Sequence, residues 1–198
     1  MRIAIAPLAI GGGALFLVAV FASFGAGFVA VAMLAYAVAA AIVAARFPGD
    51  APRGRFGPAN ALTLLRAAVA CLFAALLFEQ EPEAAIAWII VAVATAAMLL
   101  DGADGWTARR TGTATGFGAR FDMETDAAFM LILSLLVIAW GQVGWWVVTI
   151  GAMRYAFVAA SWIEPRLAGP LPPSLRRKTV CVVQVVLLIT LLAPVSWL

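Results

Sequence analysis

The sequence predicts an all-α fold, a polytopic bundle of about seven transmembrane helices. Hydrophobic residues make up 65% of the 198-residue chain and charged residues only 12%, which is about half the charged share of an ordinary soluble domain. Apolar stretches of about 20 residues, long enough to cross a hydrocarbon layer of about 30 Å, recur along most of the chain. A soluble core has no room to bury so many of them. We therefore expect an integral membrane protein embedded in a lipid bilayer.

Residues 1–46 predict a transmembrane hairpin, because apolar runs at 3–24 and 27–45 are joined by a glycine-containing turn. The first run is longer than the apolar region of a signal peptide, roughly 7–15 residues, so we interpret it as a helix of the protein. The connector 47–57 is rich in proline, glycine and arginine and is the clearest boundary in the chain. It separates the hairpin from a larger membrane domain over residues 58–198.

The larger domain contains five further apolar runs, each long enough to span the membrane. They lie at 59–78, 84–105, 119–140, 144–163 and 179–197. The connectors rich in Lys and Arg then all fall on one side, as the positive-inside rule requires of the cytoplasmic side. The opposite side receives Glu79, Glu81 and Glu83. We expect a multi-pass protein of a bacterial inner membrane or a plasma membrane.

Charge and composition exclude several classes of function. The net charge is +3, but the basic residues lie in short connectors and form no single folded surface for nucleic acid. Histidine is absent, which removes Ser-His-Asp triads, His-ligated zinc and the histidine that a lipid phosphatase would need. Cys71 and Cys181 lie far apart inside apolar runs and match no zinc pattern, so we interpret them as packing residues.

Half of the ten acidic residues lie between Asp101 and Asp126. Charges near a membrane are costly, so such a concentration is a hypothesis of function. Asp101 and Asp104, three residues apart, share one helix face; Asp122 and Asp126, four apart, share a face of the next helix. The connector 109–117 is short enough to fold the second helix back beside the first. The spacing therefore predicts that two helices direct four carboxylates at one another.

Four carboxylates that face one another repel, and divalent cations would relieve that repulsion. An all-oxygen site favours Mg²⁺ or Mn²⁺ over zinc, and a pair of such ions would neutralise a diphosphate and its leaving group. Gly105 and Gly118 lie on the same two faces and leave space for a ligand. Arg109 follows Gly105 by one turn and is placed to hold a phosphate oxygen.

The same residues carry a family signature. They read DGADGWTAR at 101–109 and, after eight residues, GARFDMETD at 118–126. This arrangement resembles the full signature of the CDP-alcohol phosphatidyltransferase family, DxxDGxxAR(x8)GxxxDxxxD. Eight fixed residues at fixed spacing make the resemblance specific. It implies a membrane-embedded transferase that takes a CDP-alcohol as its substrate.

The resemblance also implies a role for each residue. Asp101, Asp104 and Asp122 would chiefly hold the divalent metals, Mg²⁺ or Mn²⁺. Asp126 would complete the metal site and act as the general base: it would deprotonate an alcohol, which attacks the phosphorus of CDP-diacylglycerol and releases CMP. The implied CDP pocket is lined by Gly105, Ala108, Arg109 and Gly118.

A second element resembles the entry to the first helix of the family. Asn60, Thr63 and Arg66 are spaced three apart and share one helix face in the segment PANALTLLR at 58–66. Their predicted role is to bind the nucleotide or its phosphates. Two simpler interpretations stay open, with Asn60 as an N-cap and Arg66 as a snorkelling side chain.

The acceptor is a second substrate, and arginines are the candidates to bind it. Arg154 lies inside the sixth span, roughly 13 Å from its cytoplasmic end at about 1.5 Å per residue, and a buried arginine needs an anion. That anion is either an aspartate or the phosphate of the acceptor, with Arg120 and Arg176 assisting. Arg176 also suits a positive-inside anchor, and Glu124 is expected to be either a solvated residue or one that supports the metal ligands from behind. We favour a phosphorylated polyol such as glycerol 3-phosphate; serine, inositol and other alcohols stay open.

Other functions and assemblies stay open at this point. The same motif serves transfer of a CDP-linked head group to diacylglycerol. Aspartate-rich membrane prenyltransferases also bind a diphosphate through magnesium, but they lack the GxxAR…G framework; a non-catalytic protein of this fold is disfavoured because all four aspartates are present. Family members usually have six spans from the Asn-Thr-Arg helix onwards, whereas five are predicted here after an extra hairpin. Whether an N-terminal helix takes the place of the missing sixth span is open. Whether the protein is a homodimer is also open.

Overall fold

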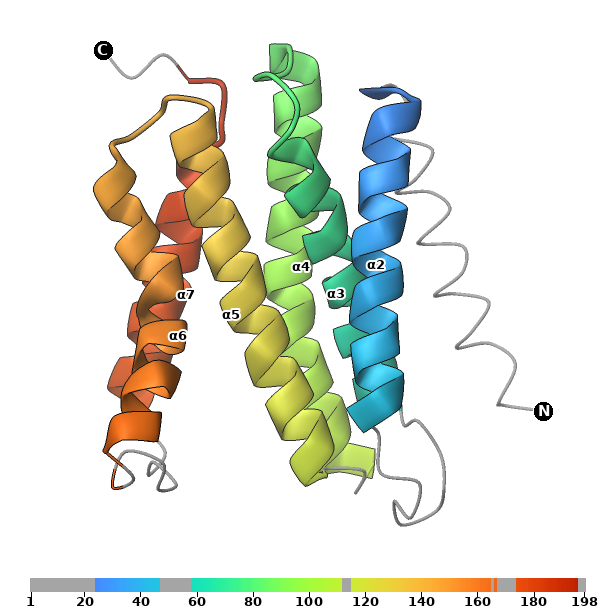
Figure 1. Cartoon of the computed structure of the whole chain (residues 1–198), viewed down its shortest axis with the longest axis vertical. Helices are drawn as coiled ribbons and strands as arrows, with labels where there is room; N and C mark the ends of the chain where they lie inside the picture. Colours follow the sequence, from blue (N-terminus) through green and yellow to red (C-terminus); the bar gives the residue numbers. More distant parts are fainter. Residues whose placement is uncertain (1–23, 47–57, 112–114, 165, 167–173, 196–198) are drawn as a thin grey trace, which may run out of the picture.

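The fold is taken from a computed structural model that describes residues 24–46, 58–111, 115–164, 166 and 174–195, with Pro58 and residues 103–111 described by their backbone alone. The described residues form six α-helices and no strand (Figure 1). The helices are α2 (Ala26–Arg46), α3 (Pro58–Leu76), α4 (Ala84–Thr111), α5 (Gly116–Ala139), α6 (Val148–Ile163) and α7 (Leu175–Leu191), with a short 3-10 helix, η2 (Trp145–Val147), before α6. The predicted all-α class is confirmed.

Two helices depart from their predicted bounds. Helix α4 continues to Thr111 instead of ending at 105, so that the whole Asp101–Arg109 segment is helical. Helix α7 runs from Leu175 to Leu191, earlier than the predicted 179–197. Its first turn contains arginines and a lysine, which are good helix formers, and Pro194 follows its end because proline cannot continue a helix.

Among the described residues, four helical segments are long and apolar enough to cross a membrane. They are Ala26–Arg46, Ala59–Leu76, Ala84–Gly102 and Trp145–Ile163. Helix α5 carries three acidic residues in its first half, and α7 is 17 residues long. The protein is thus a helical membrane protein, while the total of seven spans stays a prediction. The first predicted span and the connector 47–57 lie outside the described residues.

Successive helices run antiparallel, so the site residues gather at one end of the bundle. In Figure 1 the ends of α2, α4 and α6 and the starts of α3, α5 and α7 all lie at the lower end. Helix α3 packs against α2, α4 and α5, and α5 also packs against α6 and α7. A core of fully buried side chains joins these helices; it includes Phe73, Leu76, Ile90, Leu133, Leu136 and Leu188. The core leaves α3 and α5 little freedom to shift, and these two helices carry most of the described site.

The two ends of the bundle differ in charge. The helix ends that lie at the lower end in Figure 1 are rich in basic residues. By sequence position, the basic residues in or next to these helix ends include Arg46, Arg120, Arg166, Arg176, Arg177 and Lys178. The opposite end holds the acidic loop between α3 and α4, where Gln142 Nε2 donates a hydrogen bond to Glu81 Oε1 at 2.8 Å. This division agrees with the positive-inside pattern. The orientation of the protein in the membrane stays a prediction.

Candidate active site

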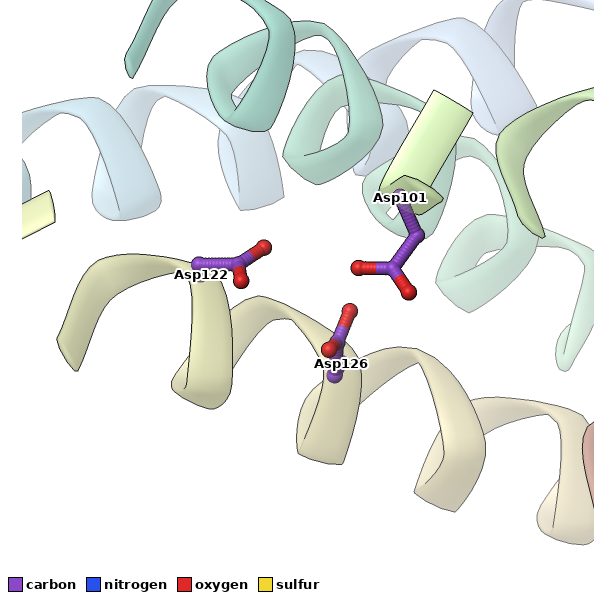
Figure 2. A group of neighbouring side chains, drawn as sticks. All are labelled: Asp101, Asp122 and Asp126. Atoms are coloured by element: carbon purple, nitrogen blue, oxygen red, sulfur yellow. The ribbon is translucent and has the colours of Figure 1, made fainter. Parts of the chain in front are cut away.

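Three carboxylates meet between α4 and α5, near the basic end of the bundle. Asp101 comes from α4, and Asp122 and Asp126 come from successive turns of α5 (Figure 2). One carboxylate oxygen of each lies within 4.8 Å of the other two. The three side chains point toward one another in Figure 2, as their spacing on two helix faces predicts. The side chains of Asp104, Gly105, Ala108 and Arg109 lie outside the described residues.

Arg66 of α3 supplies a positive charge to this cluster. Its Nη1 lies 3.0 Å from Asp101 Oδ1 and 2.8 Å from Asp122 Oδ1, and its Nη2 donates to Asp126 Oδ1. The side chain of Arg66 is only 6% exposed. One guanidinium therefore joins three helices through their charged groups. Because Arg66 is buried against the cluster, it is not a snorkelling side chain.

Asn60 and Thr63 extend this face of α3 toward the start of the helix. Both are buried. Helix α3 begins at Pro58, so Asn60 lies within its first turn and is not the N-cap. Its Oδ1 would be 2.6 Å from a Cβ at position 118, closer than any side chain tolerates, so Gly118 lets α3 approach α5 here. Thr63 donates a hydrogen bond to the carbonyl of Ala59 at 3.1 Å.

The start of α5 is held by a local cap. Thr115 precedes the helix, and its Oγ1 accepts a hydrogen bond from the Gly118 backbone N–H at 3.0 Å. Such an N-cap satisfies one of the N–H groups that a helix leaves without a partner at its start. The cap places the first turn of α5, and with it Asp122 one turn later, against α3.

Among the described side chains, Arg154 of α6 pairs with Glu124 of α5. Its Nη2 donates to Glu124 Oε1, and its Nε lies 3.4 Å from Glu124 Oε2. Glu124 is half exposed, as expected, but it is an ion-pair partner as well as a solvated residue. The other two predicted acceptor ligands, Arg120 and Arg176, are exposed near the same end of the bundle. Whether they bind an acceptor stays a prediction.

Sequence reasoning did not predict the pairing of Arg66 with the aspartates. One signal was available, because carboxylates gathered inside an apolar bundle need positive charge nearby. Arg66 is the only basic residue in α3. The pairing Glu124–Arg154 had no comparable signal, since it depends on how α6 is rotated against α5.

The cluster fits a hard divalent cation. Its described members offer only carboxylate oxygens, the ligands that Mg²⁺ and Mn²⁺ favour. They come from two rigid helices, and their oxygens already converge on one positive group. Asp101, Asp122 and Asp126 are therefore suited to hold such a metal.

Comparison with known proteins gives the family. No curated protein and no solved structure matches the chain. The model of the CDP-alcohol phosphatidyltransferase family matches residues 56–198. The match takes in α3 to α7 and every residue of the aspartate cluster, and it leaves α2 outside. It covers well over half of the chain, and we conclude that the protein belongs to the CDP-alcohol phosphatidyltransferase family.

Proposed function

We propose that this membrane transferase moves the phosphatidyl group of CDP-diacylglycerol to an alcohol and releases CMP, as a step of phospholipid biosynthesis. Family membership supports transfer from a CDP-alcohol in a lipid environment. One observation of the structure carries the proposal further. Carboxylates of α4 and α5 converge within 4.8 Å at the end of the bundle. That site would face the cytoplasm if the basic end does.

The chain's own residues would divide the chemistry between binding and proton transfer. Asp101, Asp104, Asp122 and Asp126 would hold Mg²⁺ or Mn²⁺, which neutralises the diphosphate and steadies the CMP leaving group. Asp126 would also take the proton of the acceptor hydroxyl. The hydroxyl oxygen then bonds to the phosphorus next to diacylglycerol, and the bond from that phosphorus to CMP breaks.

The nucleotide would lie between α3 and the start of α5. Asn60, Thr63 and Arg66 would line the α3 side, and Gly118 lets the start of α5 lie close to Asn60. From α4, the segment with Gly105, Ala108 and Arg109 would complete the CDP pocket. This assignment follows the family motif and the burial of the α3 residues.

The acceptor would be a phosphorylated polyol such as glycerol 3-phosphate. Arg154 supports this choice, because its guanidinium is partly buried at the α5–α6 contact and is paired there with one half-exposed carboxylate. A phosphate is a stronger bidentate partner for arginine than such a carboxylate. Arg120 and Arg176 would add positive charge at the entrance.

The proposal is tested by CMP release from purified protein given CDP-diacylglycerol and a panel of alcohols, with and without Mg²⁺ or Mn²⁺. Metal-dependent release with one acceptor is the expected result, and it names the product lipid. CMP release only from a CDP-linked head group and diacylglycerol would replace the proposal with head-group transfer. Failure to bind CDP-diacylglycerol at all would overturn it.

A further inference from the structure

We propose that Arg66 is a built-in counter-cation that holds the aspartate cluster together without metal, and that a divalent metal must displace it to bind. This role deepens the function proposed above, since it rests on the aspartates being the metal ligands. It assigns to Arg66 a control over metal loading in addition to a contact with the nucleotide.

The contacts of Arg66 are with the same groups that a metal would need. Its two terminal nitrogens reach the Oδ1 atoms of Asp101, Asp122 and Asp126. These three aspartates are also the group whose oxygens lie close enough to share one ion. Each of these contacts uses a carboxylate oxygen that a metal would also need at bonding distance, so a metal that binds these oxygens takes them from the guanidinium.

The position of Arg66 makes this pairing hard to replace with water. Its side chain is 6% exposed, whereas the three aspartates are between 34% and 42% exposed. The guanidinium therefore lies on the side of the cluster that faces the protein interior. The carboxylates are the part of the cluster that remains accessible from outside. Removal of a buried partner from such a group leaves uncompensated like charges, which is strongly destabilising.

Displacement of Arg66 also gives its predicted nucleotide contact a physical basis. Once a metal has taken the carboxylates, the guanidinium needs a new anion, because an unpaired buried charge is costly. The diphosphate of a CDP-alcohol is such an anion, and arginine binds phosphate in a bidentate manner. Metal and diphosphate would then favour each other's binding reciprocally.

The decisive experiment is Mn²⁺ binding to purified protein without substrate, followed by the loss of the free Mn²⁺ signal in electron paramagnetic resonance. Arg66→Gln should bind Mn²⁺ at least about tenfold more tightly than the wild type, because apparent affinity falls with the fraction of molecules whose ligands are free. Arg166→Gln is the matched control: it removes an exposed arginine from an ion pair with Glu164, outside the cluster, and should leave Mn²⁺ affinity unchanged. Equal or weaker binding by Arg66→Gln would overturn the proposal.

Thermal unfolding gives an independent readout. In EDTA, Arg66→Gln should unfold at a lower temperature than the wild type, and Mn²⁺ should raise its Tm by more than it raises that of the wild type. An equal Tm in EDTA would count against the role of Arg66 in holding the cluster. If Arg66→Gln does not fold with or without Mn²⁺, the same measurement is made on Arg66→Lys, because a single ammonium pairs with fewer carboxylate oxygens than a guanidinium does. Tighter Mn²⁺ binding by Arg66→Lys supports the proposal, and equal or weaker binding overturns it.

These measurements separate the role of Arg66 from the proposed reaction. A protein that releases no CMP but shows the expected Mn²⁺ pattern would overturn phosphatidyl transfer and leave the counter-cation role standing. If the wild type is an active transferase but Arg66→Gln gains no Mn²⁺ affinity, the counter-cation role is overturned and phosphatidyl transfer stands.

Discussion

Asp126 is the residue on which the proposed chemistry depends most. It is partly exposed, it lies one helical turn from Asp122, and it is one of three aspartates that Arg66 contacts. The side chain of Asp126 is 41% exposed, so the carboxylate is accessible from outside the bundle. The neighbouring Glu124 points to Arg154 instead, so two acids separated by one residue serve different contacts.

Asp126→Asn tests the general base directly. An amide has nearly the shape of a carboxylate but does not accept a proton at neutral pH, so CMP release should fall by about 10²–10⁴-fold. Binding of CDP-diacylglycerol should be largely retained. Glu83→Gln, an exposed acid at the other end of the bundle, is the control and should release CMP at the wild-type rate. Normal turnover by Asp126→Asn would remove this residue as the base.

Gly118→Ala tests the approach of α3 to α5. The added Cβ would lie 2.6 Å from Asn60 Oδ1, so Asn60 must move and the predicted nucleotide face must distort. We expect a loss of about 1–3 kcal/mol of stability, as for other overpacked sites, and weaker binding of CDP-diacylglycerol. Gly116→Ala, with open space around its Cβ, is the matched control. The measurements are Tm and ligand affinity; equal behaviour of the two variants would contradict the prediction.

Among the elements, α5 has the most demanding surroundings. It contacts α3 on one side and α6 and α7 on others, and its residues Thr125 and Ser134 are buried with their hydroxyls bonded to backbone carbonyls one turn earlier. Asp122 and Asp126 of the same helix face Arg66 of α3 and Asp101 of α4, while α5 also packs against α6. The pairing of Glu124 with Arg154 lies at this second contact.

Gly151→Ala tests the contact between α5 and α6. A Cβ at this position would lie 2.3 Å from Leu131 Cα, and a backbone atom cannot move aside as a flexible side chain can. Small residues at such crossings let helices in membranes pack closely. We expect a clear fall in Tm, by the equivalent of about 1–3 kcal/mol or more. Gly27→Ala in α2, with open space around it, should be neutral or slightly stabilising; a similar loss in both variants would contradict the close contact.

At the level of the whole molecule, the bundle is polarised along its long axis. Basic residues of the described helix termini gather at one end with the aspartates, and the acidic loop Glu79–Glu83 lies at the other. Helix α2 precedes the family-matched region and packs on α3 through the buried side chains of Phe28 and Ala32. It therefore supports the helix that carries Arg66 from outside the family core.

Cysteine labelling tests the predicted orientation. In a background without Cys71 and Cys181, we expect a membrane-impermeant thiol reagent to label Glu81→Cys in intact cells and to label Lys178→Cys only after the membrane is opened. The reason is the excess of basic residues at the Lys178 end, which favours the cytoplasmic side. The reverse pattern would place the aspartates outside the cytoplasm and contradict the predicted topology.

The helical class, the family and the facing aspartates were all predictable from the chain alone. Apolar runs determine helices locally in a membrane, because every backbone polar group must be satisfied within its own segment. The spacing of Asp101, Asp122 and Asp126 sets their helix faces in the same local way. The tertiary structure decided which charges meet. Arg66 reaches the aspartates and Arg154 reaches Glu124 because of how α3 and α6 lie against α5, and no spacing within one helix encodes the rotation of its neighbours.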